Sequence, residues 1–152
     1  MEVEVPLTLL VAVDFSDAST AVLDQARTLA LAMNAKTFLI HVAEPEPDFV
    51  GYDAGPQTVR DSVAKRFHEE HRALQNSAEE FRSDGIDAVA LLVQGPTAQT
   101  LLAEAAKLKA DLIVVGSHGK GAVKRLLVGS TSNGILHKTD LPVLVVPTHG
   151  RA

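Results

Sequence analysis

A cluster of glycines and hydroxyl side chains lies between residues 116 and 133 of the 152-residue chain. Its members are spaced as Gly116, Gly119, Gly129, Ser130 and Thr131. Glycines let backbone amides converge on an anion and let a ligand approach closely. A helix that begins at the Ser-Thr pair would add its free amides and its dipole. The segment therefore predicts a phosphate-binding site at the start of a helix.

Three better-known glycine patterns do not fit this segment. A Walker A loop needs a serine or threonine after its lysine, but a glycine follows Lys120. A dinucleotide-binding fingerprint that begins at Gly119 would need a small residue where Lys124 stands. The nucleophile elbow has one residue between its first glycine and its serine, whereas Ser117 follows a glycine directly. Gly116 and Gly119 could instead make only a tight turn at the end of a strand, and this alternative stays open.

Five short apolar runs alternate with helical patterns, which is typical of a parallel sheet covered by helices. Helices are expected after the first apolar run as far as residue 34, over 58–84, from Pro96 onward and over 131–138. A long loop is expected at 43–57. The expected strands are 7–13, 37–42, 88–93, 111–115 and Val143–Val146. We expect one α/β domain over residues 1–152, a doubly wound five-stranded parallel sheet of order 3-2-1-4-5 with helices on both faces. Its ligand crevice would lie where strands one and four end.

The composition excludes several classes of function. The chain has no cysteine, which excludes disulfides, thiolate metal sites and cysteine nucleophiles. A net charge of −5 argues against a nucleic-acid partner, because such a surface needs a basic face. The first residues lack the pattern of a signal peptide, and no apolar run is long enough to span a bilayer. A cytoplasmic protein without membrane insertion is expected.

The glycine segment and its flanking strands resemble the universal stress protein family, specifically its ATP-binding branch. That branch carries Gly-x2-Gly-x9-Gly-Ser/Thr after its fourth strand, and Gly116, Gly119, Gly129 and Ser130 match this spacing. The resemblance extends over essentially the whole chain, including the closing run at 142–147. It implies ATP as the ligand, with or without Mg²⁺.

The resemblance also implies a role for each matched position. Asp14 and Val42 would lie near the adenosine, and Val42 would offer backbone groups to the adenine edge. The glycines that follow the fourth strand would pass close to the ribose and phosphates, and residues 129–131 would donate amides and hydroxyls to the phosphates. Asp14 has a second possible role as a helix cap, and its carboxylate would repel a triphosphate without an intervening cation.

Other charged residues carry weaker signals. Lys120 and its basic neighbours could neutralise phosphate charge, although a solvated basic face is the commoner explanation. Residues 68–71 hold two histidines three positions apart, one short of the zinc-protease spacing, so a solvated helix face is expected there. His41 ends a buried strand and is expected to be a core histidine with its hydrogen bonds satisfied.

Three functions stay open. The leading hypothesis is a non-enzymatic, ATP-binding regulatory or stress-response protein that acts through ligand-dependent conformation or an unidentified protein partner, since no residue is clearly placed to cleave phosphates. The second is an enzyme that uses adenine nucleotides, as a slow ATPase or by adenylyl transfer. The third is a ligand-free dimeric interaction module. A homodimer is expected to pair through the edge strand Val143–Val146, although the prolines that flank the strand could instead protect this edge.

Overall fold

The five apolar runs form one parallel sheet in the computed structural model, which describes residues 6–15, 19–43, 57–117 and 130–147. The strand order is β3-β2-β1-β4-β5. The strands are β1 (Thr8–Ala12), β2 (Lys36–Ala43), β3 (Ala88–Gln94), β4 (Leu112–Gly116) and β5 (Val143–Val146). The predicted fold class and strand order are confirmed.

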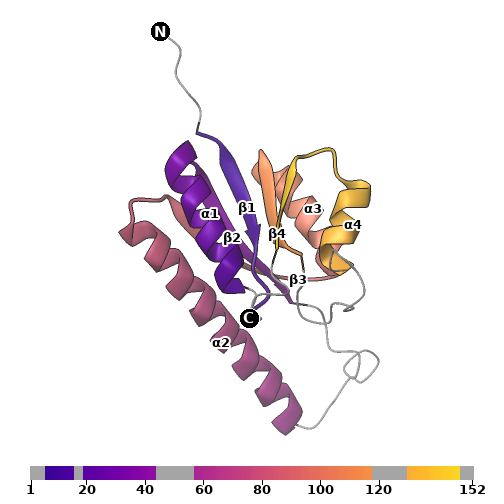
Figure 1. Cartoon of the computed structure of the whole chain (residues 1–152). Coiled ribbons are helices and arrows are strands. Elements are labelled where there is room, and N and C mark those ends of the chain that lie inside the picture. Colours follow the sequence, from indigo (N-terminus) through magenta and orange to yellow (C-terminus); the bar gives the residue numbers. More distant parts are fainter. Residues whose placement is uncertain (1–5, 16–18, 44–56, 118–129, 148–152) are drawn as a thin grey trace.

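Helices cover both faces of the sheet (Figure 1). Their bounds are α1 (Ser19–Met33), α2 (Gln57–Ser83), α3 (Thr97–Leu108) and α4 (Ser130–Lys138). One buried cluster joins the sheet to α1 and α2, and a second joins it to α3 and α4. Successive residues of β1 alternate between the clusters, with Leu9 and Val11 in the first and Leu10 in the second. Burial on both faces explains why the strands are continuous apolar runs rather than alternating ones.

Helix ends follow local backbone rules. Gly85 ends α2 with φ +88°, and its N–H donates to the Arg82 carbonyl at 2.9 Å, as expected of a glycine after a helix. Lys109 ends α3 in the left-handed region, at φ 55° and ψ 48°. The prediction that Pro96 occupies an early helical position was wrong by one residue. Pro96 is the N-cap, with extended backbone angles of φ −62° and ψ 129°, so it lies just before the first helical residue of α3.

Charged and aromatic contacts join α1 to α2. Arg27 of α1 places Nε 3.2 Å from Oδ2 of Asp84 and a terminal guanidinium nitrogen 3.5 Å from Oε2 of Glu80. The same guanidinium lies over the ring of Phe81, 5.5 Å from its centroid. Phe81 is fully buried and is among the largest buried side chains of the described residues. Together these contacts fix the second half of α2 against α1 and the sheet.

Candidate functional site

The candidate site lies at the edge of the sheet where the parallel strands end. β1 and β4 are neighbours at its centre. The chain leaves β1 toward α1 on one face, whereas α4, the next described helix after β4, lies on the other (Figure 1). Helices that return the chain between parallel strands begin at this edge, so the first turns of α1 and α4 lie here. This is the point of strand-order reversal, where doubly wound sheets bind ligands.

Asp14 lies two residues after the end of β1 and is half-buried. Its Oδ1 accepts a hydrogen bond of 2.9 Å from the hydroxyl of Ser19, the first residue of α1. The carboxylate therefore ties the exit of β1 to the start of α1. Asp14 therefore supports the start of α1, as the alternative role proposed, through a contact with the Ser19 side chain.

Val42 is buried, with 8% of its surface exposed, and its side chain packs in the cluster beneath α3 and α4. Its backbone faces the other way from that of Ala43, because polar groups alternate along a strand. Ala43 accepts a 3.1 Å hydrogen bond from Gly95 on the β3 side. The Val42 N–H and C=O consequently face β1, beyond the point where the register of β1 with β2 ends at Ile40.

The phosphate side of the predicted site is described in part. Gly116 is the last residue of β4 and pairs with Val146 of β5. Ser130 and Thr131 are the first two residues of α4, where backbone amides have no partner within the helix. The predicted site residues Gly119 and Gly129 lie outside the described residues, as does most of the predicted loop, at 44–56.

His41 and Glu70 form a contact that the sequence did not predict. His41 Nδ1 lies 2.7 Å from the Val13 carbonyl oxygen, and Nε2 lies 2.6 Å from Oε2 of Glu70 in α2. His41 thus has both ring nitrogens partnered, as expected of a satisfied histidine. The expectation of a solvated face at 68–71 holds for three positions, but Glu70 is half-buried. Its spacing of four and eight residues from the buried Leu74 and Ala78 is the sequence signal that could have placed it on the packed face.

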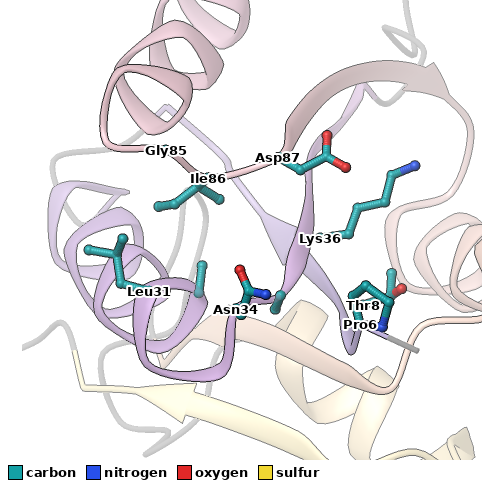
Figure 2. Close-up of a pocket in the computed structure, with 10 residues that line it drawn as sticks. Pro6, Thr8, Leu31, Asn34, Lys36, Gly85, Ile86 and Asp87 are labelled. Atoms are coloured by element: carbon teal, nitrogen blue, oxygen red, sulfur yellow. The ribbon is translucent and has the colours of Figure 1, made fainter. Parts of the chain in front are cut away.

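A separate pocket lies at the opposite edge of the sheet (Figure 2). Its lining comes from the end of α1, the start of β2 and the turn that precedes β3, and includes Leu31, Asn34, Lys36, Ile86 and Asp87. None of the predicted site residues lines it. The pocket is therefore distinct from the candidate site.

The described residues form neither a metal-binding cluster nor a membrane-spanning helix. Within residues 6–15, 19–43, 57–117 and 130–147, no three histidine or acidic side chains gather closely enough to hold a metal ion. Over the same ranges, no helix combines the length and the apolar character that crossing a bilayer requires.

Comparison with known proteins gives the family. The chain matches the Universal stress protein family over residues 7–147. The chain belongs to this family. A universal stress protein of Thermus aquaticus, named for its place in the 3′ region of a QAH/OAS sulfhydrylase gene, is 36% identical over 140 residues, which cover 91% of this chain and 97% of the relative. All predicted site residues, from Asp14 to Thr131, fall within the span that matches the universal stress protein family.

Solved universal stress proteins share the fold. UspA from Lactobacillus plantarum superposes with a TM-score of 0.78 and covers 92% of this chain and 97% of its own, and at 21% identity the match shows the fold alone. A universal stress protein solved in complex with cAMP superposes with a TM-score of 0.64 at 25% identity, covering 95% of this chain and 99% of its own.

Proposed function

We propose that this universal stress protein binds ATP at the carboxyl edge of its sheet. The observation that carries the proposal is the meeting of three features at one edge. The exit of β1 with Asp14, the β1-facing backbone of Val42 and the first turn of α4 all lie where β1 and β4 end side by side. The relative solved with cAMP supports the ligand class, because cAMP and ATP share the adenosine group.

The adenosine would lie between the ends of β1 and β2. Adenine presents an amino group beside a ring nitrogen that accepts hydrogen bonds, and this pair suits a backbone carbonyl and amide. Val42 offers both groups toward β1, past the end of the paired register. Asp14 would accept hydrogen bonds from ribose hydroxyls, alongside the bond that its Oδ1 accepts from Ser19.

The phosphates would lie at the N-terminus of α4. This helix has nine residues, and its first amides and dipole favour an anion. Ser130 and Thr131 would bind phosphate oxygens, and the family spacing assigns Gly116, Gly119 and Gly129 to the close backbone approach. A bound Mg²⁺ would supply positive charge beside the triphosphate.

The ATP-bound state would act as a signal rather than as a reaction intermediate. The leading proposal is a regulatory protein of the stress response whose nucleotide state changes its conformation or its choice of protein partner in the cytoplasm. The enzyme alternative, a slow ATPase or adenylyl transferase, predicts sustained release of phosphate or pyrophosphate from ATP by the purified protein. Release at rates of ordinary nucleotide-using enzymes, about 1 s⁻¹ or more, would favour that alternative.

The same protein is proposed to form a homodimer through β5, which lies at the edge of the sheet. Ile113 donates to the Pro142 carbonyl and Ser117 to the Val146 carbonyl, so even-numbered residues of this segment face β4. By alternation, Val143 and Val145 direct their backbone groups to the open edge. Unpaired apolar edge strands readily pair with another chain.

Calorimetric titration with ATP tests the proposed function. The wild type should bind, and ATP at 100 times its dissociation constant should raise the free energy of unfolding by about 2.7 kcal/mol, because the ligand binds only the folded state. Gly129→Leu should abolish binding without unfolding the protein. Lys36→Ala, in the opposite pocket, is the matched control and should bind normally. A wild type that shows neither heat nor stabilisation at millimolar ATP would leave the ligand-free interaction module as the better description.

A further inference from the structure

We propose that His41 and Glu70 are positioning residues of the nucleotide site. His41 would occupy the Val13 carbonyl and thereby keep the Val42 amide available to adenine, while Glu70 would hold the imidazole from α2. The inference rests on the proposed function, since it names the residues that prepare that site. It also links α2, a helix that contributes none of the predicted site residues, to nucleotide affinity.

The hydrogen bonds at the end of β1 depart from the regular ladder between β1 and β2. The Val13 N–H donates to the Ile40 carbonyl at 2.8 Å, so the polar groups of Val13 face β2. If the parallel ladder continued, the Val13 carbonyl would next accept the Val42 N–H. Instead, the imidazole Nδ1 of His41 lies 2.7 Å from that carbonyl oxygen. The His41 side chain thus takes the place of the Val42 N–H at the Val13 carbonyl, and adenine binding needs this Val42 N–H to be available.

The residue after Asp14 also contacts His41. Phe15 adopts φ 61°, a left-handed conformation that is unfavourable for a bulky residue and persists only when its surroundings hold it. Its ring packs on the His41 imidazole, with 4.6 Å between centroids and 55° between planes. His41 therefore contacts the residues on both sides of Asp14 and fixes the direction in which the chain leaves β1.

The imidazole of His41 is held by a carboxylate of α2. Its Nε2 lies 2.6 Å from Oε2 of Glu70, whose other oxygen lies 3.4 Å from Nε of Arg66. The side chains of His41 and Glu70 are only 14% and 19% exposed, so water competes weakly for the contact. A carbonyl and a carboxylate can only accept, so the imidazole is held between two hydrogen-bond acceptors. Glu70 and Arg66, both on α2, are the charged groups that these contacts join to the ring.

The test measures ATP affinity in four variants. Glu70→Gln removes the carboxylate charge beside the ring, and His41→Gln replaces the two ring nitrogens with a single amide nitrogen. Each should raise the dissociation constant for ATP by about tenfold, the equivalent of one net hydrogen bond. Glu69→Gln and His71→Gln make the same chemical changes at exposed neighbours on α2 and should stay within about twofold of the wild type. Equal affinity in all four variants would overturn the positioning role.

Two NMR measurements separate positioning from simple structural support. In the ATP-free wild type, the Val42 amide should exchange rapidly with solvent. In His41→Gln the Val42 amide should be protected, because the ladder bond to Val13 can then form. A slowly exchanging Val42 amide in the ATP-free wild type would overturn the inference even if the variants fail to fold. If the wild type binds no ATP, the proposed function fails first, whereas a binding wild type with unaffected variants refutes only the role of His41 and Glu70.

Discussion

Replacing Gly95 by alanine should destabilise the carboxyl edge of the sheet strongly. Gly95 follows β3 and anchors the end of β2, because its N–H donates to the Ala43 carbonyl next to Val42. Its φ of +151° lies in the region that disfavours side chains, and an added Cβ would lie 2.5 Å from Oγ1 of Thr100 in α3. The substitution therefore carries two separate costs.

The two costs can be given magnitudes. The backbone conformation should cost about 1–3 kcal/mol for a residue with a Cβ. The overpacking against Thr100 should add about 1–3 kcal/mol, and less if the threonine rotates away. Gly95→Ala should thus lower the free energy of unfolding by about 2–6 kcal/mol, a large share of the roughly 5–15 kcal/mol typical of a domain.

A double-mutant cycle with Thr100→Ala separates the costs. The second substitution removes Oγ1 and leaves the nearest remaining atom, the Cβ of residue 100, at the ordinary contact distance of 3.7 Å. Urea unfolding of the four proteins should give a favourable coupling of about 1–3 kcal/mol, with the backbone cost still present in the double variant. Strict additivity, or a single Gly95→Ala variant as stable as the wild type, would refute the reasoning.

Further predictions concern a helix end and the sheet edge. Lys109→Gly should stabilise the protein by about 0.5–1 kcal/mol in thermal unfolding, because glycine adopts the left-handed conformation of this α3 cap without strain. Lys107→Gly, inside the last turn of α3, should destabilise the protein by about as much. If both substitutions stabilise or both destabilise the protein, the left-handed cap at Lys109 is contradicted. Val145→Pro should dissociate the proposed dimer in analytical ultracentrifugation and leave the fold intact, because its N–H faces the open edge. The backbone groups of Leu144 face β4, so Leu144→Pro should unfold the protein. A Val145→Pro variant that stays dimeric would exclude pairing through β5.

The fold could be predicted well because burial on two faces leaves a strong mark on a strand. Apolar runs at 88–93 and 111–115 became β3 and β4 with shifts of at most one residue at each end, and β5 matches its predicted bounds. The glycine-serine spacing similarly located the start of α4 to within one residue. Each of these features depends on residues that are close together in the sequence.

The details of the site were less predictable because they depend on contacts between distant residues. Glu70 reaches His41 only because α2 packs against the sheet at a particular position along its length, which polar residues at 68–71 do not reveal. The availability of the Val42 backbone depends on where β1 stops relative to β2. Neither fact follows from the local pattern of apolar and polar residues.

The most direct test of the central claim is to map ATP binding residue by residue in the isotope-labelled protein. Titration with ATP should shift the backbone amide signals of Asp14, Val42, Gly116 and the first turn of α4, which all lie at the carboxyl edge of the sheet. The signals of Asn34, Lys36 and Asp87, at the opposite edge, should not move. Shifts confined to the opposite pocket, or no saturable shifts at any residue, would contradict the proposal that β1 and β4 form the nucleotide site.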